Sequence, residues 1–110
     1  MLKYVSLLET RAGGGSRQTG ARLKDDGTIL IEGHDLGPGV DVFLGAGMTE
    51  YEWALSIKPP GVRALKMALA CDDDVLAALG QRFSGDASAD LQPFLDSNDV
   101  PYEFWSRLGE

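Results

Sequence analysis

Cysteine and histidine are almost absent from this chain of 110 residues, which has one of each. A single cysteine excludes an internal disulfide framework and a cysteine-based zinc site, so we expect no cofactor and no metal. No apolar run approaches the roughly 18 residues of a membrane span, and Lys3 interrupts the first segment where the apolar core of a signal peptide would lie. We therefore expect a soluble, cytoplasmic protein that does not enter a membrane.

Basic side chains are scarce in the second part of the sequence. Residues 1–66 carry eight basic and eight acidic side chains, whereas residues 67–110 carry two basic and nine acidic ones. The whole net charge of −7 therefore belongs to residues 67–110. A field of this sign repels phosphate backbones, so it disfavours nucleic-acid binding and favours a basic partner. Solubility alone is the plainer interpretation of the same charge.

The first half of the sequence has the pattern of strands and tight turns. Strand-forming side chains are frequent in residues 2–10. Two further short strands, at 21–24 and 28–33, flank Asp25-Asp26-Gly27, which is typical of a tight hairpin turn. Strict alternation of apolar and polar side chains over residues 50–58 indicates an antiparallel strand with one buried face.

Glycine clusters interrupt this pattern in two places. Residues 12–20 include four glycines beside serine and threonine, and we predict a flexible loop or the wide end of a hairpin there. A phosphate cradle is not favoured, because no Gly-Lys-Ser/Thr sequence follows the glycines. Residues 34–50 contain five glycine and proline breakers, and we expect a single helical turn or a short edge segment.

The apolar period becomes helical after residue 60. Helices are predicted to begin near Val62, after a cap at Asp72 or Asp73, after a cap at Asp90, and at Pro101. The last of these helices would carry the aromatic side chains near the end of the chain.

The order of strands first and helices afterwards predicts an α+β fold in a single domain over residues 1–110. We expect a small antiparallel sheet from residues 1–58, with helices from residues 60–108 packed on one face. The alternation in the last strand places Trp53 and Leu55 between this sheet and the first helix.

Glu32, His34 and Asp35 form the one acid–histidine–acid cluster of the sequence. Histidine exchanges protons near neutral pH, so a carboxylate beside it and a cleft in front of it would suit general-base chemistry. Glu32 and His34 project to the same side of an extended strand. A metal site would need a third ligand such as Asp41 or Glu50, and no spacing rule supports one. A histidine that hydrogen-bonds the neighbouring loop is the plainer interpretation.

Four residues are candidates for contact with a protein partner. Asp72 and Asp86 lie at the expected turns between helices, in the acidic part of the chain. Trp105 and Arg107 lie near its end, and tryptophan, tyrosine and arginine are frequent among interface hot spots. A solvated acidic surface and closure of the core by the aromatic segment are the plainer interpretations.

Three stretches of this sequence resemble a known group of proteins: Glu32-Gly-His-Asp-Leu-Gly-Pro-Gly, Tyr51-Glu-Trp and Tyr102-Glu-Phe-Trp-Ser-Arg-Leu-Gly. They are similar to stretches in a group of short hypothetical proteins, mostly from actinobacteria. The group has no assigned activity, so the resemblance implies a complete small protein and transfers no functional residue.

Two classes of function follow from these observations. We favour a small acidic, non-enzymatic interaction protein of the immunity or inhibitor kind that binds a basic protein partner, because no recognised catalytic set is present. The alternative is a small enzyme or ligand binder that uses Glu32, His34 and Asp35 near the glycine-broken loop 37–47. A concave pocket holding His34 would favour the alternative, and a convex acidic surface beside an exposed aromatic would favour the interaction protein.

Overall fold

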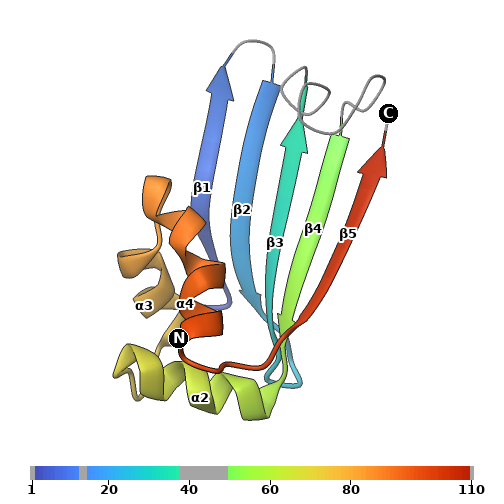
Figure 1. Ribbon diagram of the computed structural model, residues 1–110. Helices are drawn as coiled ribbons and strands as arrows, with labels where there is room; N and C mark the ends of the chain where they lie inside the picture. The colour runs from blue at the N-terminus through green and yellow to red at the C-terminus, as the bar shows by residue number, and fades with distance from the viewer. Residues whose placement is uncertain (1, 13–14, 38–49, 110) are drawn as a thin grey trace.

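The computed structural model describes residues 2–12, 15–37 and 50–109, and it shows a twisted antiparallel sheet with helices along one face (Figure 1). The five strands are β1 (Tyr4–Ala12), β2 (Gly15–Leu23), β3 (Ile29–Leu36), β4 (Glu50–Ile57) and β5 (Glu103–Gly109). The helical elements are α2 (Pro59–Leu69), α3 (Val75–Arg82), the 3-10 helix η1 (Gly85–Asp90) and α4 (Leu91–Ser97). The predicted α+β fold is confirmed.

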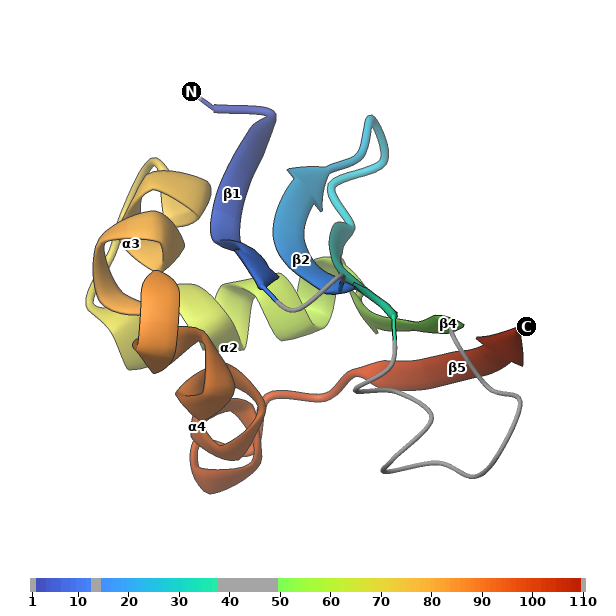
Figure 2. The same cartoon turned by 90° about the horizontal axis from the view of Figure 1, so that it is seen from above.

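The strands lie in the sheet in chain order, so β1 and β5 are its two edges. Seen from above, the helices gather beside β1 and β2, while β4 and β5 extend past them (Figure 2). Helix α3 and η1 contact β1, and α2 contacts β4. The opposite face of the sheet is not covered by any of the described helices. None of these helices is long and apolar enough to cross a membrane.

The core lies between the helices and the sheet face that carries Ala21, Ile31 and Leu55. These three residues are direct register partners across β2, β3 and β4, so their side chains form one buried row. Eight large side chains are fully buried: Ile29, Ile31, Leu55, Ile57, Leu65, Leu76, Leu79 and Leu95. The members from β3 and β4 fall on alternate positions, which confirms the alternation predicted for residues 50–58.

The predicted hairpin turn at Asp25-Asp26-Gly27 is confirmed between β2 and β3. Gly27 has a φ of 89°, a conformation that glycine adopts without a steric penalty. The backbone N–H of Thr28 donates to Asp26 Oδ1 at 2.9 Å. This hydrogen bond lowers the pKa of Asp26, because it favours the ionised carboxylate. The turn is therefore formed by Asp26 and Gly27, the residue types from which it was predicted.

Of the two alternatives for residues 12–20, the flexible loop is wrong for most of the segment, whereas a hairpin does connect β1 to β2 there, with Ala12 opposite Gly15. Gly15–Leu23 is a strand that pairs along its length with β1 and with β3. Tyr4 of β1 lies across Gly20, where an added Cβ would come within 2.7 Å of Tyr4 Cε2. Hydrogen-bonded pairing of β2 with β1 and with β3 thus outweighs the low strand propensity of the glycines in β2. Gly13 and Gly14 lie outside the described residues.

The prediction of a helix starting at Pro101 is also wrong, because Glu103–Gly109 forms β5. The segment pairs with the free side of β4, where Phe104 lies opposite Leu55 and Trp105 opposite Ala54. Aromatic side chains suit a pleated surface, and the unpaired backbone of an edge strand offers a full row of hydrogen bonds. This pairing outweighed the local helix signals. The helices of the second half therefore end with α4.

The cap of α3 is Asp74 and not the predicted Asp72 or Asp73. The Asp74 carboxylate accepts from Ala77 N at 3.2 Å and from Leu2 N at 3.0 Å. The second bond ties the start of the chain to the helical layer. Both hydrogen bonds favour the ionised carboxylate, and that from Leu2 contributes most to the lowered pKa of Asp74.

Two other local predictions have mixed outcomes. Asp90 occupies the position before α4, as predicted, but its side chain makes no capping hydrogen bond. The reason is that η1 precedes α4 directly, so Asp90 already has helical backbone angles. The helical turn or edge segment predicted within residues 34–50 lies mostly outside the described residues, and β3 extends through Leu36 before that gap.

Leu55 is buried as predicted, whereas Trp53 is half-buried. The Trp53 indole lies across its register partner Gly33, and an added Cβ on Gly33 would overlap the ring. The residue also lines a hollow of about 290 Å³ together with Gly85 and Asp86 of η1. The packing of Trp53 therefore depends on a glycine in β3 and on its position beside η1.

We expect Gly33→Ala to lower the free energy of unfolding by about 1–3 kcal/mol, because the new methyl group overpacks the Trp53 ring. Urea unfolding at neutral pH measures this change. In a Trp53→Ala background the same substitution should cost much less, since the ring it meets is gone. An equal cost in both backgrounds would contradict the contact.

Candidate functional site

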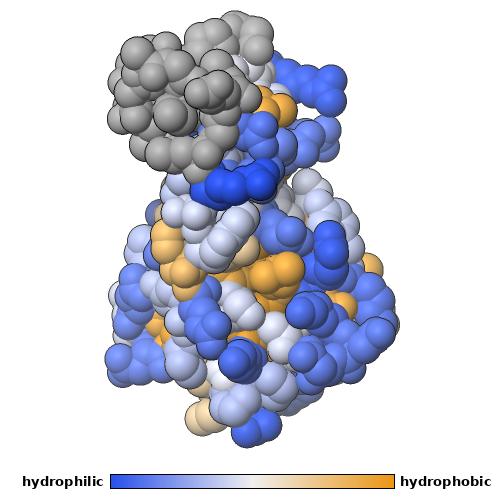
Figure 3. Space-filling model, turned by 90° about the vertical axis from the view of Figure 1, so that its right-hand side faces the viewer, coloured by the Kyte–Doolittle hydropathy of each residue, from blue (hydrophilic) through white to orange (hydrophobic). Residues whose placement is uncertain are grey.

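The uncovered face of the sheet holds an open hollow of about 510 Å³. Small residues on this face, such as Ser6, Gly20 and Ala54, leave the space, and the aromatic side chains of Tyr4 and Trp105 border it from the two edge strands. Tyr4 is 56% exposed and Trp105 53% exposed. Figure 3 views the molecule from the side of β5, and the part of the surface seen from there has hydrophobic residues in its middle with hydrophilic ones around them.

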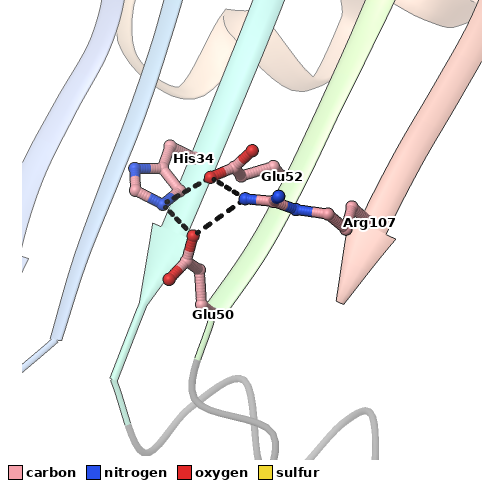
Figure 4. Close-up of polar contacts among 4 residues, drawn as sticks. All are labelled: His34, Glu50, Glu52 and Arg107. Atoms are coloured by element: carbon pink, nitrogen blue, oxygen red, sulfur yellow. Dashed lines mark hydrogen bonds and ion pairs between the residues drawn. The ribbon is translucent and has the colours of Figure 1, made fainter. Parts of the chain in front are cut away.

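Four charged or titratable side chains meet at one end of this face (Figure 4). His34 of β3 lies opposite Glu52 of β4, which in turn lies opposite Arg107 of β5. Glu50 and Glu52 project to the same side of the sheet, because they are two residues apart on β4. We call these four residues the His34 cluster. Its members come from three adjacent strands, so the sheet register alone brings them together.

Ion pairs connect the two glutamates of the His34 cluster to Arg107. The Arg107 guanidinium donates to Glu52 Oε1 at 3.0 Å and lies 3.8 Å from Glu50 Oε1. The pKa of Glu50 is lowered, first by its hydrogen bond with Glu52, then by His34, with Arg107 adding an electrostatic contribution. The ionised form of Glu50 is therefore favoured in the folded protein.

His34 directs Nε2 at both carboxylates. Nε2 lies 3.2 Å from Glu50 Oε1 and 3.6 Å from Glu52 Oε1. The atom is shielded from solvent, yet no contact at it has the geometry of a hydrogen bond. The shielded ring nitrogen and the two carboxylate oxygens can share a proton between them, or they can bind a cation together.

The structure separates the acid–histidine–acid cluster that the sequence suggested. Glu32 shares the face of His34, as expected, but it pairs with Arg22 at 3.3 Å. Asp35 projects to the opposite face and lies 3.4 Å from Arg17. The carboxylates next to His34 are instead Glu50 and Glu52 of the neighbouring strand.

The four candidate protein-binding residues lie on two different surfaces. Asp72 lies in the turn between α2 and α3 and Asp86 in η1, and both are exposed on the helical layer. Trp105 and Arg107 lie on β5 and face the hollow side of the sheet. The structure therefore does not bring the four residues into one patch.

Glu52 is the site residue that the sequence interpretation did not name. The alternation over residues 50–58 already placed it on the polar face of a strand. Its contact with His34 required the register between β3 and β4, which the composition of the two segments does not specify. Glu50 was named as a candidate third ligand, and it does lie beside His34. Asp41, the other candidate, lies outside the described residues.

No family model, curated protein or solved structure matches this chain. The interpretation of the surfaces therefore depends on their own geometry and charge.

We expect Glu50→Gln to make the stability of the protein less sensitive to acid. A lowered pKa means that the contribution of the ionised Glu50 is present above its ordinary value of 4.5 and is lost as the pH falls through the lowered value. The urea midpoint, measured from pH 6 down to about pH 3, should therefore fall less steeply in the variant than in the parent protein.

Glu9→Gln is the matched control, because it removes one exposed carboxylate from β1, outside the His34 cluster. It should keep the pH dependence of the parent protein. A Glu50→Gln profile as steep as that of the control would show that the cluster does not stabilise ionised Glu50.

Proposed function

We propose that this protein is a small, acidic, non-enzymatic interaction protein that binds a basic protein partner in the cytoplasm, in the manner of an immunity or inhibitor protein. The observation that supports this proposal is the unequal compensation of charge on the two sides of the molecule. Most carboxylates of the sheet have basic partners, and most of those on the helical layer do not.

The described strands compensate most of their acidic side chains, and Glu9 of β1 is the exception. The pairs are Arg17 with Asp35, Arg22 with Glu32, Lys58 at the end of β4 with Glu103, and Arg107 with Glu50 and Glu52. Exposed ion pairs of this kind contribute little to stability, but they reduce the net field of the surface that carries them. The uncovered face therefore has only a small charge surplus to offer a partner.

The helical layer carries exposed aspartates without such compensation. Five exposed aspartates are Asp72, Asp73, Asp86, Asp90 and Asp99, and a sixth, Asp96, accepts a hydrogen bond from the Tyr102 hydroxyl. Within residues 2–12, 15–37 and 50–109, none of these five forms an ion pair with a lysine or an arginine. Arg82, the basic residue of α3, lies instead over the ring of Phe94, 4.5 Å from its centroid. We call these five residues the acidic surface.

A surface of one sign attracts a partner of the opposite sign and accelerates association. The same field repels nucleic acids, so a protein with exposed lysines and arginines is the favoured partner. The residues of the acidic surface lie in turns, in η1 and at the ends of helices. Such positions can change without loss of the core, and they are typical of recognition surfaces on a rigid scaffold.

A small-molecule ligand in the hollow is the second candidate function, and the concave shape beside His34 favours it. Two observations make this function less well supported than the interaction with a basic protein. Asp35 lies on the other face, and Glu32 is already paired with Arg22. A general base oriented by either of these carboxylates is therefore not assembled.

We expect Asp72→Asn/Asp86→Asn to slow association with the partner. Neither residue caps a helix, since Asp74 caps α3 and Asp86 lies inside η1, so the double variant should fold normally. The partner is first captured from source cells at low salt and identified by mass spectrometry, then purified for surface plasmon resonance. The association rate should fall by about threefold or more at low salt, and its dependence on salt should become weaker.

The matched control is Glu9→Gln/Asp25→Asn, which changes the net charge equally but alters exposed positions on β1 and in the hairpin turn. The control should keep most of the association rate. Equal losses in both variants would indicate a response to total charge alone. An unchanged rate in Asp72→Asn/Asp86→Asn would remove the acidic surface from the interaction.

A further inference from the structure

We propose that His34, Glu50 and Glu52 form a binding site for a divalent transition-metal ion, of which zinc is the best match. The site lies on the uncovered face of the sheet, away from the acidic surface, and it does not depend on the proposed function. The metal ion would be the ligand of His34 Nε2 and of the carboxylate oxygens that face it, which the ion pairs with Arg107 do not explain.

The donor atoms already have nearly the spacing of a metal site. Atoms bound to zinc at about 2.0–2.1 Å, at the corners of a tetrahedron, lie about 3.4 Å from one another. His34 Nε2 lies 3.2 Å from Glu50 Oε1 and 3.6 Å from Glu52 Oε1. All three donor atoms lie within 4.8 Å of one another. A zinc ion therefore needs only small side-chain rotations, with no change of the backbone.

His34 Nε2 gives an independent reason for a ligand at this place. The atom is shielded from solvent and forms no hydrogen bond within the described part of the chain. Two carboxylate oxygens lie at ion-pair distance, but a shielded polar atom whose contacts lack hydrogen-bond geometry still costs free energy. A metal ion satisfies the nitrogen lone pair and the two carboxylates at once. The same atom that lacks a hydrogen bond is thus the one that a metal would use.

The strands give the three ligands a rigid frame. His34 and Glu52 are direct register partners, and Glu50 and Glu52 share one face of β4. Ligands held by paired strands lose little conformational freedom on binding, because the sheet has already fixed their backbones. The ion would join β3 to β4 at the end of the sheet where each strand meets the undescribed segment.

Arg107 is a neighbour of this site and not one of its ligands. Its guanidinium donates to Glu52 Oε1, while His34 approaches the same oxygen at 3.6 Å. A carboxylate oxygen has two lone pairs, so it can accept this hydrogen bond and still bind a metal. Carboxylate ligands are commonly oriented by such outer hydrogen bonds.

The donor set decides which ions fit. One imidazole nitrogen and two carboxylate oxygens suit zinc and other first-row transition metals, whereas calcium and magnesium prefer oxygen ligands alone. Three protein ligands fill three corners of a tetrahedron and leave the fourth for water. We therefore expect binding of zinc and cobalt, and much weaker binding of magnesium.

Isothermal titration of the tag-free protein with zinc chloride tests the site. We expect one ion per chain and an affinity at least about tenfold weaker in His34→Gln and in Glu52→Gln, since even outer-shell changes commonly cost about 10–100-fold. Glu32→Gln is the matched control, because Glu32 shares the face of His34 but lies outside the donor set. The control should bind zinc as the parent protein does.

A second measurement needs no variant and is unaffected if a variant fails to fold. The chain has a single histidine, so the imidazole signals in a ¹H–¹⁵N NMR spectrum report on His34 alone. Zinc should shift the Nε2 resonance far more than the Nδ1 resonance. Equal affinity in His34→Gln, an unchanged Nε2 resonance, or no binding at millimolar zinc would each overturn the proposal.

Discussion

The pairing of β4 on both of its sides is the constraint on which the rest of the structure depends. One side holds β3 and the other holds β5. Alternate residues of β4 then serve opposite tasks, because Leu55 and Ile57 enter the core while Glu50 and Glu52 meet His34 and Arg107. A slip of one residue in this register would exchange the two sets, burying the carboxylates and exposing the core.

The predictions from sequence that proved correct concern residues whose conformation is decided by their immediate neighbours in the chain. Asp26 and Gly27 make their hairpin turn through their own hydrogen bonds and backbone angles, and the alternation around Leu55 reflects its two-sided environment. The Gly20 region and Trp105 were misassigned because their strands depend on partners distant in the sequence. The candidate site was only half found for the same reason, since strand register decides which glutamates reach a histidine.

The molecule separates its charge into two regions with different chemistry. On the sheet, acidic and basic side chains are matched, and specificity comes from donor atoms held in fixed positions, as around His34. On the helical layer, residues such as Asp72 and Asp99 are exposed and contribute mainly through their common sign. We propose that the first arrangement binds a small ion by geometry and that the second attracts a large partner at long range. The core separates them, so one can change without the other.

The separation of β4 and β5 along the chain has a consequence for synthesis. All of the helices that the structure describes are translated between these two neighbouring strands. A nascent chain that has reached the end of α4 already contains the apolar side chains of β4, but one row of its backbone N–H and C=O groups has no partner. Such an edge is a template for pairing with another chain. The interval between the emergence of β4 and the emergence of β5 from the ribosome is therefore the one in which chaperones would protect this protein best.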